Sequence, residues 1–187
     1  MASKMHLTRG NATSRFIKIM RSIKSLVAIF GVMFVLSTAL FAQTSLTSLD
    51  GGKVDIQAQR GKVVILAVGA SWLPLSGKQA EYTNMLAKRY AGKNVVVYFV
   101  ATDSATAKSR NFATNADITK FVTGSRLSVP VLRDPDGVAT LKKFSVDQLP
   151  SFVILDKQGS VSGSAFGGID PKFDVTVPIS KAVDKLL

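Results

Sequence analysis

One turn in this sequence gathers the side chains best placed to do chemistry. The stretch Val63–Tyr82 reads as a buried strand, a tight turn that holds the only tryptophan, Trp72, and the start of a helix. Ser76 is the nucleophile candidate there, because a serine hydroxyl can attack an electrophile when an adjacent base takes its proton. That base is missing: the only histidine is His6, and Lys78 faces away from Ser76 on the expected helix. We therefore interpret Ser76 as a small polar residue in the first helical turn.

The composition excludes several kinds of site. The chain has 187 residues and no cysteine, which rules out disulfides, thiolate nucleophiles, zinc–thiolate and iron–sulfur centres and a lipid-modified cysteine. The segment Asp134–Gly137 carries two carboxylates but lacks the further oxygen ligands and the closing glutamate of a calcium loop, so we expect a turn and helix cap there. We expect neither a cofactor nor a metal.

The N-terminal segment has the order of a secretory signal peptide. Residues 1–24 are basic and polar, Leu26–Leu36 is an unbroken apolar run, and small residues follow as far as Ala42. We expect residues 1–42 to be a signal peptide, cut after Ala39 or Ala42. The alternative is an uncleaved N-terminal membrane anchor formed by residues 26–42. Both alternatives place the rest of the chain outside the cytoplasm, in the periplasm or another extracytoplasmic space.

The net charge of +12 is unevenly spread. The first 42 residues hold six basic and no acidic side chains, and the remainder holds 18 basic and 12 acidic ones. The basic residues of this remainder are dispersed and are not interleaved with aromatic ones, which argues against nucleic-acid binding. We expect a solvated surface that is favourable near anionic lipid or cell-wall polymer.

The residues after the leader predict one α/β domain over 43–187. Three continuous apolar runs are typical of strands buried on both faces: Val63–Val68, Asn94–Ala101 and Ser151–Leu155. Ser160–Phe166 is expected to return along the last of these after a tight turn. Expected helices have Pro74 in a first turn, run from Thr102-Asp103-Ser104 to about Thr114, cover Val138–Phe144, and lie near Val177–Leu187. This order predicts a central mixed β-sheet flanked by helices.

The sequence words in this order resemble those of the thioredoxin superfamily, in particular its exported TlpA/ResA-type, redoxin-like branch of thiol–disulfide oxidoreductases. The matching words are Gly61–Leu66, Ala70-Ser71-Trp72, Leu132–Gly137 and Leu149–Gly159. The resemblance covers about Leu46 to Leu187 and implies a thioredoxin-like fold. It also implies that Pro150 is the family's cis-proline.

The departure from the family lies at the centre of its site. Family members read Trp-Cys-x-x-Cys, whereas Leu73 and Ser76 stand at the two cysteine positions of this chain. Gln79 occupies a position where an acid is common, and Ala67 and its neighbours offer no buried carboxylate to manage protons. In the family, free backbone N–H groups and the helix dipole lower the pKa of a thiol at the helix N-terminus. Leu73 has no ionisable group on which they could act.

Binding is the activity that survives this loss. The resemblance implies that an extended peptide or exported protein pairs beside the cis-proline, where six residues would form an apolar patch: Trp72, Leu73, Pro74, Leu75, Leu149 and Pro150. A non-redox binding or scaffold module is therefore our leading hypothesis, with membrane contact through the N-terminal segment if it is uncleaved. The alternatives are a family-type thiol–disulfide oxidoreductase that acts by a non-thiol route, and an inert relic. For the patch itself, the rival interpretation is that nearby loops cover Leu73 and Leu75 and that Trp72 is ordinary packing.

Overall fold

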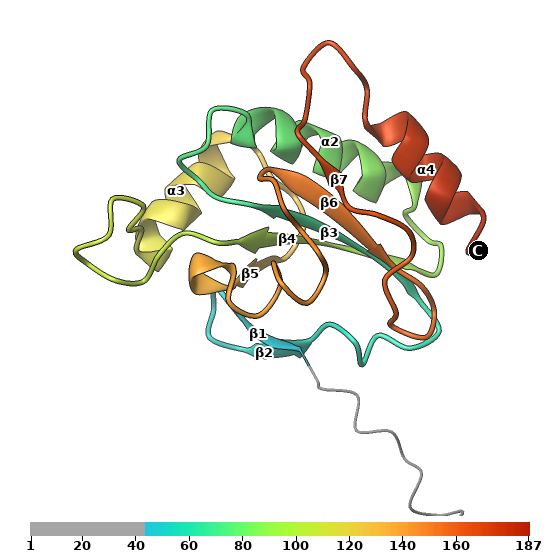
Figure 1. Ribbon diagram of the computed structural model, residues 1–187, viewed down its shortest axis with the longest axis horizontal. Helices are drawn as coiled ribbons and strands as arrows, with labels where there is room; N and C mark the ends of the chain where they lie inside the picture. The colour runs from blue at the N-terminus through green and yellow to red at the C-terminus, as the bar shows by residue number, and fades with distance from the viewer. Residues whose placement is uncertain (1–43) are drawn as a thin grey trace, which may run out of the picture. The chain divides into compact units, whose positions relative to one another are not determined.

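The computed structural model describes residues 44–187, so the expected leader lies outside the described residues. Within them, one mixed sheet has the strand order β2-β1-β5-β4-β3-β6-β7 (Figure 1). The strands are β1 (Ser45–Ser48), β2 (Lys53–Asp55), β3 (Val63–Gly69), β4 (Val95–Ala101), β5 (Val131–Arg133), β6 (Ser151–Leu155) and β7 (Phe166–Gly167). The helices are α2 (Ser76–Arg89), α3 (Asn115–Gly124), α4 (Thr176–Asp184) and the short 3-10 helix η1 (Pro135–Gly137). No helix in this part of the chain is long and apolar enough to cross a membrane.

Strand β3 lies in the interior of the sheet, between β4 and β6, as its unbroken apolar run predicts. It pairs in parallel with β4 and antiparallel with β6, so Val68 lies opposite Ser151. All seven of its residues are buried. Alternate side chains enter two separate apolar clusters, one on each face of the sheet, because neighbouring residues of a strand point in opposite directions.

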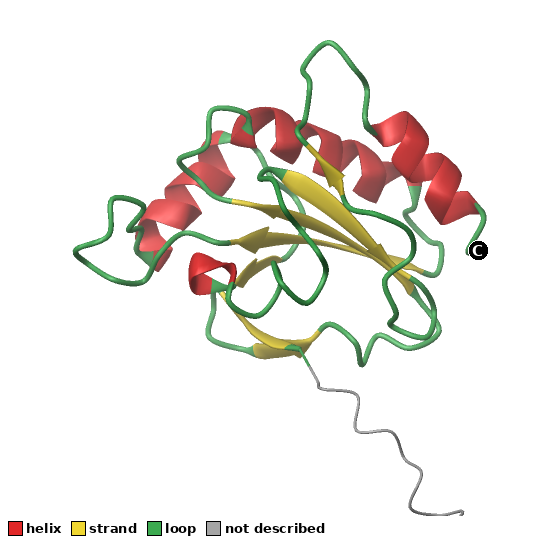
Figure 2. Ribbon diagram, in the orientation of Figure 1, coloured by secondary structure: helices red, strands yellow, loops and turns green. Residues whose placement is uncertain are grey.

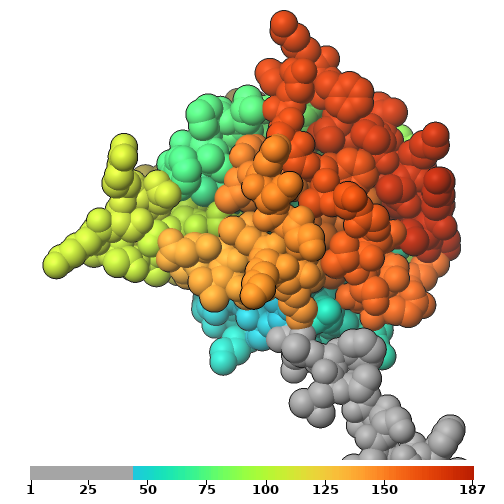
Figure 3. Space-filling model, in the orientation of Figure 1, coloured from blue at the N-terminus to red at the C-terminus, as the bar shows by residue number. Residues whose placement is uncertain are grey.

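The three α-helices cover one face of this sheet, and loops cover the other (Figure 2). Leu86 of α2, Ile118 of α3 and Ile179 of α4 pack into the cluster on the helical face. The opposite cluster is closed by Ile56 and Phe144, which come from irregular segments. The space-filling view shows the segment around residues 140–165, in orange, spread over the side turned to the viewer (Figure 3).

The expected helix from Thr102 to Thr114 is wrong. An exposed loop occupies most of this stretch, and α3 begins only after Thr114. Thr114 Oγ1 accepts a hydrogen bond from the Asp117 backbone N–H at 3.2 Å, and the Asp117 carboxylate accepts one from the Thr114 N–H at 3.1 Å. This reciprocal capping box starts the helix at the C-terminal end of the predicted range.

Three smaller expectations also need correction. Helix α2 starts at Ser76, so Pro74 lies in the preceding turn and not in the first helical turn. The stretch Val138–Phe144 forms turns after η1 instead of a short helix. The return strand Ser160–Phe166 is reduced to one bridge at Val161 and the two-residue β7, because the chain leaves the sheet between them. The final helix is confirmed as α4, with bounds shifted by a few residues.

Candidate functional site

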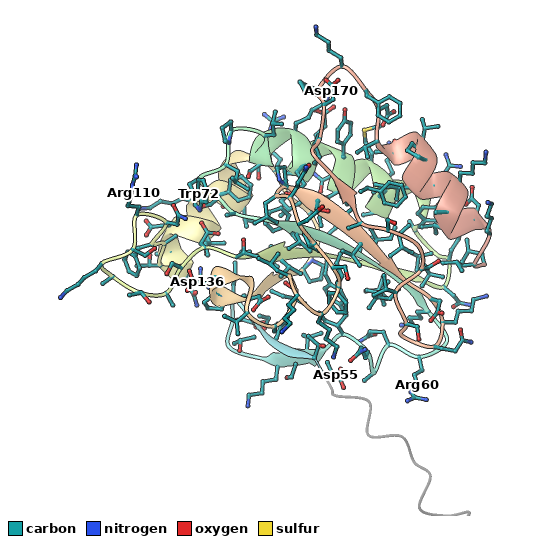
Figure 4. The ribbon with its side chains drawn as sticks, viewed as in Figure 1. Asp55, Arg60, Trp72, Arg110, Asp136 and Asp170 are labelled. Atoms are coloured by element: carbon teal, nitrogen blue, oxygen red, sulfur yellow. The ribbon has the colours of Figure 1, made fainter. Side chains whose placement is uncertain are left out.

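The turn between β3 and α2 presents the only tryptophan to solvent. Trp72 is 50% exposed and lies near the end of the sheet where β3 and β4 finish (Figure 4). Backbone hydrogen bonds close the turn at both ends, from the Leu73 N–H to the Ala70 carbonyl at 3.3 Å and from the Ser76 N–H to the Leu73 carbonyl at 3.1 Å. The tryptophan is therefore carried by a tight turn that is anchored to a buried strand.

Ser76, the candidate nucleophile, is buried, and its hydroxyl donates a hydrogen bond to the Ala70 carbonyl. Lys78 is the nearest amine along the helix, and its Nζ lies 2.8 Å from a Glu81 carboxylate oxygen. The hydrogen bond to Glu81 raises the pKa of Lys78, which keeps the amine protonated and unable to accept a proton. The structure thus places Ser76 as a polar residue that ties the turn to the helix, with no base beside it.

Gln79 forms the polar base of the site, beneath the turn. Its side chain is fully buried, and its Nε2 donates to the Val68 carbonyl at 3.0 Å and to the Ser151 carbonyl at 2.9 Å. These two acceptors belong to residues paired across β3 and β6, so one amide joins the helix to both strands. A Cβ atom on Gly69 would collide with the Gln79 Oε1, which explains the glycine at the end of β3. A neutral amide can donate both bonds at any pH, whereas an ionised carboxylate here could donate neither.

Asp103 is a residue of the site that sequence reasoning missed, because it was assigned to a helix cap. Its side chain is fully buried just after β4. Its two carboxylate oxygens accept from the Ser71 backbone N–H at 3.0 and 3.1 Å, and one accepts from the Ser71 hydroxyl at 2.5 Å. The Thr102 hydroxyl also donates to the Gly69 carbonyl at 2.9 Å. The signal that could have found Asp103 is an acid directly after a buried parallel strand, at the sheet edge that carries the turn.

The six residues of the predicted patch reach one edge of the sheet but differ in exposure. Trp72 and Pro74 are exposed, whereas Leu73 is half-buried. Leu75 is half-buried against the cluster under the helices, and Leu149 is half-buried against the opposite cluster. Leu75 and Leu149 therefore contribute mainly to packing.

The remaining position of the patch is Pro150. The Leu149-Pro150 peptide bond is cis, as the resemblance implied. Pro150 itself is buried at the start of β6, and it lies close to the turn because Ser151, the next residue, pairs with Val68.

Asp134 and Asp136, which have a faint calcium-loop spacing, are both engaged in turn contacts. The Asp134 carboxylate accepts from the Ala139 and Thr140 backbone N–H groups at 2.9 and 2.8 Å, and Asp136 accepts from the Ser104 hydroxyl at 3.2 Å. The expected turn is confirmed, but the expected cap is not, because the Asp134 side chain accepts no capping hydrogen bond from η1. Among the described residues, no three acidic or histidine side chains are grouped so that they could hold a metal ion.

Solved structures show that the fold is thioredoxin-like. The exposed lipoprotein thioredoxin of Streptococcus pneumoniae superposes with a TM-score of 0.61 and 25% identity over 78% of this chain and all of that one. A thioredoxin-like protein from Aeropyrum pernix gives a TM-score of 0.62 and 20% identity over 86% of this chain and 99% of its own.

Curated sequences point to the same group. The thiol-disulfide oxidoreductase ResA of Bacillus cereus is 29% identical over 121 residues, which span 65% of this chain and 64% of ResA. The pattern that describes the AhpC/TSA family matches residues 39–164, from before β1 to just before β7. That range contains the Trp72 turn, Gln79, Asp103 and Pro150. The turn, Gln79, Asp103 and Pro150 thus belong to a redoxin domain without a cysteine, and the chain belongs to the AhpC/TSA family.

Proposed function

We propose that this domain is a non-redox module that binds an extended polypeptide at the Trp72 turn. The observation that carries the proposal is the half-exposed Trp72 next to the exposed Pro74, on a turn held from below by Asp103 and Gln79. Tryptophan is among the residues that dominate binding energy at interfaces, and an anchor that is already rigid loses little entropy when a partner binds. Leu73 supplies a half-buried apolar neighbour.

The chemistry of the turn supports binding over electron transfer. Thiol–disulfide exchange begins with attack by a thiolate, and neither Leu73 nor Ser76 can supply one. The Ser76 hydroxyl is already hydrogen-bonded to the Ala70 carbonyl. We also propose that the domain acts outside the cytoplasm, in line with the exposed lipoprotein among its structural relatives.

Trp72 fluorescence tests the binding proposal directly, because no second tryptophan interferes. The full chain is titrated with an unfolded polypeptide that contains no tryptophan, and the emission shift is followed. We expect saturable binding, weakened at least about tenfold by Leu73→Asp because a charge would be desolvated at the contact. Val161→Asp is the matched control, since Val161 is 40% exposed and bridges Leu155, which pairs with Val64 at the opposite end of β3 from the turn.

The result that would overturn the proposal is equal binding by the Leu73→Asp and Val161→Asp variants, or no saturable emission change. Insulin reduction with dithiothreitol tests the alternative, an oxidoreductase that acts without thiols. Turnover above the protein-free rate would replace the binding proposal with that activity.

A further inference from the structure

Helices α2 and α4 form a second surface, away from the Trp72 turn. They lie side by side in parallel: the Tyr82 hydroxyl donates to the Phe173 carbonyl at 3.1 Å, and the Tyr90 hydroxyl donates to the Ser180 carbonyl at 3.1 Å. A shallow groove of about 440 Å³ runs between the helices near the C-terminal end of α2. The 14 residues of α2 separate this end from the turn by roughly 20 Å, so the two surfaces can be occupied independently.

Three large apolar side chains project from this face into solvent. Val177, which lines the groove, is 64% exposed, Phe173 is 57% exposed and Met85 is 43% exposed. Met85 lies one helical turn before Arg89, another groove residue, and so shares its side of α2. Exposed apolar residues that gather in this way mark a contact surface.

Basic side chains border the apolar residues. Arg89, Lys181 and Lys185 line the groove, and Lys93 Nζ lies 5.3 Å from the centre of the Tyr90 ring. Asp184 is the only acid that lines the groove in this described part of the chain, and Arg89 pairs with it at 3.2 Å. The pKa of Asp184 is lowered first by the hydrogen bond that the Tyr90 hydroxyl donates to it and then by Arg89. The negative charge of Asp184 is therefore already compensated. Lys93 also interacts with Asp184, whereas Lys181 and Lys185 form no salt bridge that is recorded among the described residues.

The kind of cation distinguishes between possible anionic partners. Protein interfaces are enriched in arginine and depleted in lysine, because the guanidinium forms paired hydrogen bonds with carboxylates. The one arginine here is already bound to Asp184, and the free cations are lysines on flexible stems. Lysines around exposed aliphatic and aromatic side chains are typical of surfaces that lie on anionic lipid.

We propose that the α2/α4 face, defined by Met85, Arg89, Val177, Lys181 and Lys185, binds the surface of an anionic lipid bilayer. Val177 and Met85 enter the headgroup region, and the lysines neutralise lipid phosphates around them. The face binds peripherally, and its contact leaves the Trp72 turn at the other end of α2 free for a partner.

The absence of cysteine makes a site-specific test possible, because one introduced thiol labels one position. Full-length Val177→Cys, labelled with an environment-sensitive fluorophore, is mixed with vesicles of phosphatidylglycerol and phosphatidylcholine. We expect a blue shift that requires phosphatidylglycerol and weakens as salt rises. Val138→Cys is the matched control, because Val138 is at least as accessible as Val177 but follows η1, whose neighbours pack on the opposite face of the sheet. Both proteins carry the same N-terminal segment, so binding through that segment affects them equally.

Charge reversal completes the test. Adding Lys181→Glu and Lys185→Glu to the labelled chain should raise the half-saturating lipid concentration at least about 25-fold, roughly fivefold for each lysine. The proposal is overturned by equal shifts at positions 177 and 138, by an equal shift with phosphatidylcholine alone, or by no effect of the charge reversals. A shift of the same size with polyglutamate and none with vesicles would assign the face to an acidic polypeptide instead.

Discussion

The rim of the candidate site and its buried base differ in kind. The rim carries the apolar residues Trp72, Leu73 and Pro74, which are exposed or half-buried and make no side-chain hydrogen bonds that the structure records. The base is polar and fully buried: Gln79 joins α2 to β3 and β6, and Asp103 joins the end of β4 to the turn. The rim offers no thiol, while the polar contacts of the base hold the turn that carries it.

This difference explains how the turn can keep its position when the rim residues vary. An exposed residue can change with little effect on stability, because it leaves no unsatisfied group behind. A buried polar residue cannot, because its hydrogen-bond partners would remain desolvated. The base therefore keeps the turn in place whatever side chains the rim presents.

Restoring two cysteines should have the largest effect. Leu73→Cys with Ser76→Cys places a thiol at the start of α2, where free backbone N–H groups and the helix dipole favour a thiolate. If the base still positions the turn, the double variant gains insulin reductase activity from the protein-free rate. The single Leu73→Cys variant is the control, because it has no second thiol to release a mixed disulfide. A double variant that forms no intramolecular disulfide would show that the base does not hold the turn as the family requires.

Removing the amide of the base should be the most destabilising single change within the site. Gln79→Leu leaves the Val68 and Ser151 carbonyls buried without this donor, each at a cost of about 1–3 kcal/mol, so the free energy of unfolding should fall by about 2–6 kcal/mol. Urea denaturation followed by circular dichroism measures the change. A loss below about 1 kcal/mol would mean that the base is not what holds the two strands to α2.

Asp103→Ala should cost less, because it removes one anchor of the turn while the strands stay joined. The Ser71 N–H and hydroxyl lose their acceptor, which we expect to cost about 1–3 kcal/mol. Trp72 emission should also shift to the red as the turn loosens. Asp103→Asn retains one acceptor oxygen and should lie between the two proteins. Unchanged emission in Asp103→Ala would show that the Asp103 carboxylate does not hold Trp72 in place.

A change at the rim should affect stability least. Leu73→Ala removes a half-buried side chain that belongs to neither apolar cluster, so we expect a loss of less than about 1 kcal/mol. The same urea measurement applies, with Leu66→Ala in β3 as a fully buried reference that should lose about 2–5 kcal/mol. Comparable losses at positions 73 and 66 would contradict the division between rim and base.

Local patterns in the sequence predicted most of the architecture. The errors arose where the same residues can serve either a local structure or a contact with a distant part of the chain. The apolar runs of β3, β4 and β6 could hardly form anything but buried strands. Thr102-Asp103-Ser104 has the composition of a helix cap, yet the Asp103 carboxylate accepts from Ser71, which is distant in sequence. The actual cap is Thr114, whose partner Asp117 stands three residues later, a spacing that the sequence did contain.

By itself, the sequence determined the strands, the absence of thiol chemistry and the cis-proline implied by its resemblance, because each depends on residue type or on short-range order. Tertiary structure decided which polar residues hold the Trp72 turn and which apolar residues stay exposed. Gln79 meets Ser151 across 72 positions of the chain, and Asp103 meets Ser71 across 32. The partners of a buried polar group are set by the packing of strands and helices, so a linear pattern could identify these side chains but not their contacts.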